Sequence, residues 1–208
     1  MRYRVCSAAV LMATLMIGAA WGCEGKTLIF EDKFQDDLGG WDKEPAMKIE
    51  DGSMVLRPTG SNGSLSELNT AFLATDVDVC AEVVLPREFP ETGPTAGLLF
   101  WAVDYSNMYL SVVSLKGQAF LYRRSNQKWF KIWDQEAPRA KQGPGASNLL
   151  RVVAKGNLVT VFVNGEKVRE VRVQAPSGET RFGTYVERDK PVEGQTFAFK
   201  NFKVTRPE

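Results

Sequence analysis

The carboxylates of one alternating segment are the side chains best suited to chemistry. Residues 76–85 read DVDVCAEVVL, which places Asp76, Asp78 and Glu82 on the same face of a strand. Two carboxylates suffice for glycoside hydrolysis when they lie about 5–5.5 Å apart for retention or about 6.5–9.5 Å apart for inversion. Asp78 and Glu82 stand four residues apart, so their α-carbons are about 13 Å apart in a strand. We therefore expect solvated acids here, with Glu82 the leading catalytic candidate if the protein is an enzyme.

The chain of 208 residues contains no histidine. This excludes a Ser-His-Asp or Cys-His triad and any imidazole metal site. The three cysteines are too scattered for a thiolate metal site, and no glycine-rich phosphate loop opens a helix. These exclusions lean against an enzyme and leave the question of catalysis open.

Aromatic residues in the central hairpins are a second set, since an exposed ring can stack on the face of a sugar. Alternation places Trp129, Lys131 and Trp133 on one face of a strand, opposite Phe130 and Ile132. The predicted ligand-binding residues are Trp101, Tyr109, Tyr122, Trp129, Lys131 and Trp133. The competing interpretation is that these residues fill the core of a sandwich, because aromatics are common in strands.

Acidic residues near the N-terminus suggest a metal site. If the first strand lies beside the last, Asp32 could approach Asn201, and their oxygens would be ligands for calcium. A solvated acidic edge, which discourages pairing between sheets, explains the same residues. Apart from this calcium ion, we expect no cofactor.

Residues 1–22 are predicted to be a secretory signal peptide. Two arginines precede an apolar run from Val5 to Ala20, which is short for a membrane span and ends in small residues. We therefore expect an exported protein, located in the periplasm or outside the cell.

Two fates are open to Cys23, the first residue after the predicted cleavage. It resembles a lipobox cysteine preceded by the small Gly22, and lipidation would anchor the domain to a membrane as a lipoprotein. Alternatively, an oxidising compartment would allow a disulfide between Cys23 and Cys80. The two fates exclude each other.

The charge of the chain limits its partners. The 26 basic and 25 acidic residues nearly balance, and removal of residues 1–22 takes away two arginines and no acid. Near-neutrality without a basic cluster argues against binding to nucleic acid or to anionic lipid. We expect a glycan, a cell-envelope polymer or a protein as partner, and a membrane only through a lipid on Cys23.

Beyond the signal peptide, the pattern has a period of two almost throughout and predicts no amphipathic helix. Asp51-Gly52 and Asn164-Gly165 are typical of tight hairpins. Roughly a dozen strands joined by short turns cannot be parallel, because parallel crossovers need about a dozen residues each. We predict that residues 23–208 form one all-β domain, a two-sheet antiparallel jelly-roll sandwich.

A series of short motifs runs along residues 27–205. They are Leu28–Phe34, Gly40-Trp41, Ile49–Leu56, Phe100 with Asp104, Asn107 and Tyr109, then Asn148–Val152, Val163–Gly165, Gly183 and Phe199–Val204. Their order resembles the concanavalin A-like lectin/glucanase superfamily, in particular its bacterial laminin-G-like and 3-keto-disaccharide-hydrolase-like domains. The resemblance implies a jelly roll, which lectins, glycosidases and protein-binding modules share. The Glu-x-Asp-x-x-Glu strand motif of the glucanases is missing, which argues against glucanase activity.

Three functions are compatible with these observations. The first is an exported, non-catalytic domain that binds glycans or cell-envelope polymers. The second is a protein-interaction or structural module of the envelope. The third is a sugar-processing hydrolase of the keto-disaccharide type.

Overall fold

The structure is a computed structural model that describes residues 22–36, 39–42, 44–59, 63–87, 93–188 and 194–208. The predicted signal peptide, except for Gly22, therefore lies outside the described residues. The described residues form strands, turns and bends without any helix. Accordingly, this part of the chain has no helix long and apolar enough to cross a membrane.

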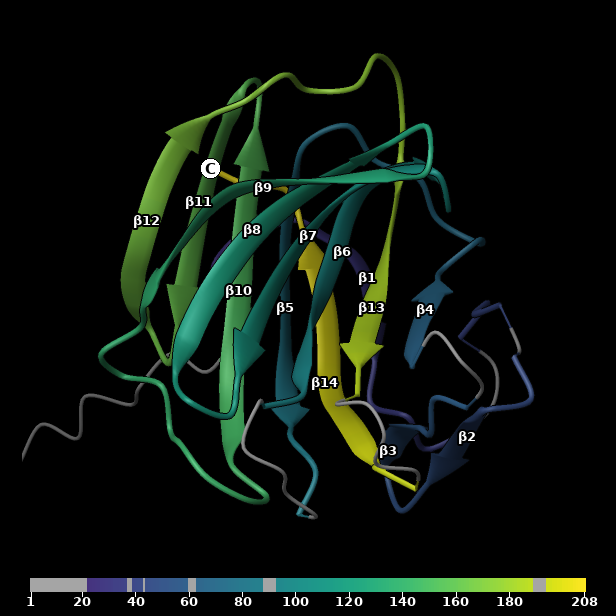
Figure 1. The fold of residues 1–208 in the computed structure, drawn as a ribbon. Helices are drawn as coiled ribbons and strands as arrows, with labels where there is room; N and C mark the ends of the chain where they lie inside the picture. Colours follow the sequence, from purple (N-terminus) through teal and green to yellow (C-terminus); the bar gives the residue numbers. More distant parts are fainter. Residues whose placement is uncertain (1–21, 37–38, 43, 60–62, 88–92, 189–193) are drawn as a thin grey trace, which may run out of the picture.

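The strands pair into two antiparallel sheets that stack as two layers, with β6, β7 and β8 in front of β5 and β10 in Figure 1. The eight-stranded sheet has the order β12 (Glu166–Arg172), β11 (Leu158–Val163), β10 (Ser147–Lys155), β5 (Val77–Val84), β14 (Phe197–Thr205), β3 (Ser53–Leu56) and β2 (Met47–Glu50), and β1 (Leu28–Asp32) pairs with β14. The six-stranded sheet has the order β4 (Ser64–Leu68), β13 (Arg181–Glu187), β6 (Thr95–Asp104), β7 (Asn107–Ser114), β8 (Gln118–Ser125) and β9 (Lys128–Glu136). This arrangement confirms the predicted all-β sandwich.

The main core lies between the two sheets. On β5, Val77, Val79, Ala81 and Val83 all face it, as the alternation of the sequence predicts. Phe182 of β13 stacks on Phe202 of β14 with ring centroids 5.9 Å apart, so aromatic contacts join the two layers directly. Burying such apolar surface is the dominant stabilisation of a sandwich of this size.

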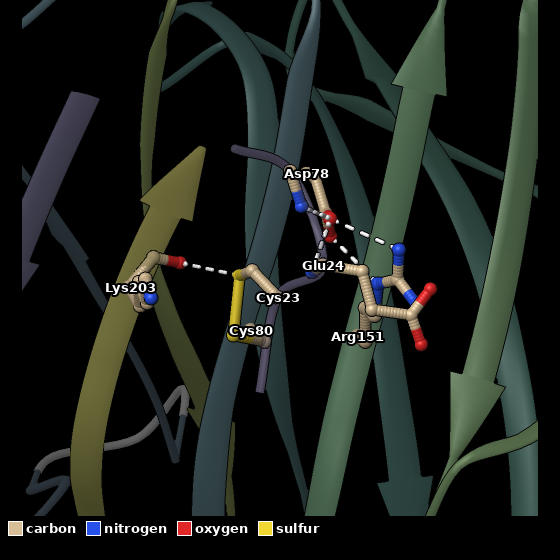
Figure 2. The surroundings of a disulfide bond; sticks show 7 residues. Cys23, Glu24, Asp78, Cys80, Arg151 and Lys203 are labelled. Atoms are coloured by element: carbon tan, nitrogen blue, oxygen red, sulfur yellow. Dashed lines mark hydrogen bonds and ion pairs between the residues drawn. A yellow bond between two sulfur atoms is a disulfide. The ribbon is translucent and has the colours of Figure 1, made fainter. Parts of the chain in front are cut away.

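A short N-terminal segment, residues 22–27, crosses the outer face of the eight-stranded sheet. Figure 2 shows how it is fastened: Cys23 is joined to Cys80 of β5 by a disulfide with a Cα–Cα distance of 5.5 Å. The backbone amides of Glu24 and Gly25 donate to the Asp78 carboxylate at 2.9 and 3.2 Å. The structure thus has the disulfide fate of Cys23 and not a free thiol.

The same segment completes a buried charge cluster. Arg151 of β10 donates from Nε and Nη2 to the two carboxylate oxygens of Asp78, at 2.8 and 3.0 Å, and pairs with Glu24 at 2.7 Å (Figure 2). The Asp78 side chain is only 1% exposed, so the expectation of a solvated acid is wrong for this residue. A buried carboxylate needs such partners, because the desolvation cost of a lone charge is large.

We expect loss of the disulfide to destabilise the domain. Cys23→Ser should lower the free energy of unfolding by about 2–4 kcal/mol, because the bond restricts the unfolded chain and holds the segment over Asp78. Chemical denaturation of the protein measures this change. Lys26→Ala is the matched control, since the Lys26–Glu208 ion pair in the same segment is exposed and such pairs contribute little. An unchanged unfolding free energy for Cys23→Ser would contradict the assignment.

Candidate functional site

The outer face of the six-stranded sheet is apolar, although no second sheet covers it. Leu68, Leu99, Met108, Leu110 and Val112 form a second buried cluster on this face, each at most 2% exposed. Strand β7 is consequently buried on both of its faces. A large apolar surface on one side of a sheet must be covered, and here side chains from the strands of the same sheet cover it.

Three aromatic rings arch over this cluster. Trp129 of β9 contacts Tyr122 of β8 at 6.2 Å and Tyr185 of β13 at 6.0 Å between ring centroids. In the sheet, β9 and β13 are separated by β8, β7 and β6, a span of roughly 19 Å if the sheet were flat. The sheet is therefore strongly curved, with this outer face concave, and Figure 1 shows β8 and β9 as long, bent strands.

The arch encloses a groove of about 260 Å³ on the concave face. Its walls are the aromatic side chains Phe120, Tyr122, Trp129 and Tyr185, its floor is Leu110 and Val112, and Thr95 and Glu187 lie at its polar end. Gly97 pairs with Tyr185 and Val112 within the floor, and an added Cβ there would collide with the Ser111 carbonyl oxygen. Only glycine fits at this close approach of two strands.

The two phenols of the groove are hydrogen-bond donors at physiological pH. Tyr185 donates from its hydroxyl to Glu187 at 3.2 Å. Burial, and then the neighbouring Glu187 carboxylate, raises the pKa of Tyr185 well above its ordinary value. Burial also raises the pKa of Tyr122. Both hydroxyls therefore stay protonated beside the aromatic walls.

The residues predicted to bind a ligand are divided between the groove and the core. Tyr122 and Trp129 line the groove, and Lys131 lies opposite Tyr122 in the pairing of β8 with β9. The Lys131 ammonium pairs with Asp134 at 3.0 Å. The other three predicted residues are Trp101, Tyr109 and Trp133, which belong to the main core and are 2%, 4% and 5% exposed.

Irregularities in two strands explain why alternation misplaced the tryptophans. The β8–β9 register shifts between Leu121–Trp133 and Tyr122–Lys131, so Trp133 faces the core while Lys131 and Trp129 face the groove. The expected common face of Trp129 and Trp133 is therefore wrong. In β6 the register shifts after Phe100, where Trp101 has a φ of 48° and donates from its indole to the Thr75 carbonyl at 2.7 Å.

Glu82 and Asn201, predicted for different roles, line one pocket on the outer face of the eight-stranded sheet. This pocket of about 260 Å³ also includes Lys141 and Ser147, whose hydroxyl donates to the Glu82 carboxylate. Asp78, the nearest acid of the same strand face, is engaged by Arg151. Glu82 thus lies on the sheet opposite the aromatic groove, with no second free carboxylate of β5 beside it.

The first strand does pair with the last, as the calcium hypothesis requires, and Asp32 lies opposite Phe202. The Asp32 carboxylate, however, accepts from the Phe34 amide at 2.6 Å and from the Trp41 indole at 2.8 Å. Asn201, at a φ of 51°, lines the pocket of Glu82 instead. Within the described residues no group of three or more acidic or cysteine side chains could hold a metal ion, so the calcium site finds no support there.

Sequence reasoning missed Tyr185 and Glu187 as groove residues. Alternation within Arg181–Glu187 already places both on one face of a strand, but nothing in the sequence indicates that this strand lies across the groove from Trp129. A third missed residue is Glu67 of β4, which is completely buried. Burial, with the nearby Glu44 and Asp42 carboxylates, raises the pKa of Glu67 to about 8.

The sheet order, the curvature and the concave groove define a concanavalin A-like jelly roll. Among solved structures, the CBM66 carbohydrate-binding module from Bacillus subtilis is similar, with a TM-score of 0.63 and 18% identity over 81% of this chain and 97% of that module. The Emp47p carbohydrate recognition domain has a TM-score of 0.67 and 16% identity over 90% and 100%. A Bacillus licheniformis beta-glucanase has a TM-score of 0.63 and 10% identity over 86% and 98%. Such low identities establish the fold alone.

The family is settled by sequence. The model of the 3-keto-alpha-glucoside-1,2-lyase-like domain matches residues 25–205, and the chain belongs to this family. Among the curated proteins, none matches the chain. The predicted resemblance to keto-disaccharide-hydrolase-like domains of the concanavalin A-like superfamily is therefore confirmed.

Glu67 makes the stability of the domain depend on pH. The unfolded chain releases this proton near the ordinary pKa of 4.5, whereas the folded chain holds it until about pH 8. The contribution of Glu67 to stability is therefore fully present below pH 4.5 and is lost as the pH rises from 4.5 towards 8. Glu67→Gln should remove this loss. Between pH 4.5 and pH 8, the unfolding free energy of the variant should therefore fall by about 2–5 kcal/mol less than that of the parent protein.

Denaturation midpoints across this pH range measure the effect. Glu136→Gln, at an exposed position of β9, is the control and should leave the pH profile unchanged. Identical pH profiles for Glu67→Gln and the parent protein would show that Glu67 ionises freely in the folded state.

Proposed function

We propose that the domain binds glycans in the concave groove of the six-stranded sheet. The carrying observation is the arch of Tyr122, Trp129 and Tyr185 over an apolar floor, since flat aromatic walls suit the C–H faces of sugar rings. Donors and acceptors at the polar end, Thr95 and Glu187, would fix the orientation of sugar hydroxyls. Two structural neighbours are a carbohydrate-binding module and a carbohydrate recognition domain, which supports the same proposal.

We propose binding without catalysis as the main activity. Among the described residues that line the groove, Glu187 is the single carboxylate, and its partner is the Tyr185 hydroxyl. Hydrolysis by a carboxylate pair would need a second acid at a set distance. The absence of histidine from the whole sequence removes the most common general base.

Membership of a lyase-like family supports a second candidate, a sugar-processing enzyme acting on keto-glucosides. Glu187 is then the catalytic residue that the groove favours, in place of Glu82 on the opposite sheet. Incubation with 3-keto-α-glucosides and with ordinary disaccharides, followed by product analysis, tests this candidate. Under it, Glu187→Gln should abolish product formation while Glu82→Gln should not; absence of product from the parent protein rejects it.

We further propose that the domain works outside the cytoplasm, after removal of residues 1–22. The Cys23–Cys80 disulfide supports this location, because disulfides persist in oxidising compartments. Mass spectrometry of the protein purified from a bacterial host distinguishes the disulfide from the lipid modification of Cys23. A mature chain starting at Cys23 and lacking two thiol protons fits the disulfide, whereas an added diacylglycerol would identify a lipoprotein.

The main proposal makes Trp129 the key residue for binding. Trp129→Ala should weaken glycan affinity at least about tenfold, because it removes a wall of the groove and one stacking ring. Calorimetric titration against a panel of bacterial and plant glycans measures the loss. Phe130→Ala is the matched control, since this neighbour is 52% exposed and faces away from the groove.

Fluorescence gives an independent readout. Trp41, Trp101 and Trp133 are each at most 7% exposed, whereas Trp129 is 40% exposed, so Trp129 should carry the change in emission on ligand binding. Trp129→Phe should lose that change while Trp133 and the others still report folding. Flat titrations of the parent protein against the whole panel would overturn the proposal.

A further inference from the structure

Beside the Trp129 wall of the groove lies a positive charge, that of Arg124, which no described residue compensates with an ion pair. Arg124 of β8 lies opposite Met108 and Trp129 in the strand pairings, which places it on the concave face. Its guanidinium carbon lies 5.2 Å from the centroid of the Trp129 ring. The same charge acts on the Tyr185 phenol, so the guanidinium lies near both walls of the arch.

Within the described part of the chain, Arg124 makes no ion pair and no hydrogen bond, and its Nε is buried without a partner. Two acidic residues of the same sheet are already engaged: Asp134 pairs with Lys131, and Asp104 accepts from the Ser106 amide and the Asn107 side chain. Glu187 accepts a hydrogen bond from the Tyr185 hydroxyl. A partly buried guanidinium without a carboxylate is costly, and its planar fork matches a carboxylate in geometry.

Three other arginines of this domain are paired with carboxylates. Arg151 is held by Asp78 and Glu24, Arg139 by Glu166, and Arg57 by Glu50. Arg123, the neighbour of Arg124 on the same strand, lies over Tyr109 on the opposite face and donates to Gln174. Arg124 therefore combines a place at the groove with a free charge.

We propose that Arg124 binds an anionic substituent of the bound sugar, so that the groove selects glycans containing uronic acids. The inference rests on the proposed glycan binding and adds the class of ligand. A uronate ring would stack between the aromatic walls while its carboxylate meets the guanidinium that already lies against Trp129. The Trp129 ring, against which the guanidinium lies, would hold Arg124 in the orientation needed for two parallel hydrogen bonds to the carboxylate.

Matched ligand pairs that differ only in charge test the inference. The probes are oligogalacturonate with its methyl ester, and glucuronate-containing oligosaccharides with their glucose counterparts, titrated by calorimetry. The parent domain should bind the acidic member of at least one pair at least about tenfold more tightly, the effect of one charge-assisted hydrogen-bonded pair. Increasing sodium chloride should reduce this preference.

Substitutions of Arg124 test whether this residue is the source of the preference for the acidic ligand. Arg124→Gln should remove the acidic preference and leave the affinity for the neutral member within about threefold, since the stacking walls remain. Arg124→Lys should keep part of the preference, because it retains the charge and loses the fork. Arg123→Gln is the matched control on the opposite face and should bind both members like the parent.

The outcomes separate the two proposals. Tight binding of neutral glycans without acidic preference overturns the inference on Arg124 and leaves glycan binding standing. An equal loss of affinity for the acidic and the neutral ligand in Arg124→Gln also overturns it. The residue would then maintain the structure of the groove and would not recognise the charge of the ligand. No binding of any member by the parent overturns both proposals.

Discussion

The six-stranded sheet has apolar side chains on both faces, and the shape of the molecule follows from covering both. The inner face, with residues such as Leu98 and Phe100, packs on the eight-stranded sheet. The outer face, with Leu99 and Leu110, has no second layer among the described residues and is covered by rings from its own outer strands. Because rings from strands this far apart can meet only over a curved sheet, the same apolar burial that stabilises the sheet also makes it concave.

This curvature forms the groove from side chains of the strands, because every described residue that lines it lies on β6, β7, β8, β9 or β13. Trp129 serves the fold by covering Leu110 and serves the groove by forming its wall, which leaves it 40% exposed. The floor is apolar, Thr95 and Glu187 are polar lining residues, and Arg124 lies beside the Trp129 wall.

The opposite sheet uses its outer face in a different way. There the segment fastened by Cys23 covers Asp78 and Arg151, so charged residues are buried as a fully partnered cluster. The segment that covers the eight-stranded sheet is not one of its strands, whereas the aromatic arch consists of side chains of the six-stranded sheet itself. One face is therefore sealed by a disulfide-bonded segment, and the other is left as a hollow bounded by rings.

The sequence by itself determined the all-β class, the antiparallel sandwich, the inward face of β5 and the two fates of Cys23, because period-two alternation and tight-turn dipeptides act over a few residues. It placed Trp133 on the same face as Trp129, which the bulge in β9 contradicts. Only the tertiary structure decided which aromatics reach the groove. One extra residue at a bulge reverses the face of every side chain beyond it, and contacts such as Trp129 with Tyr185 depend on strand order and curvature, which local pattern does not encode.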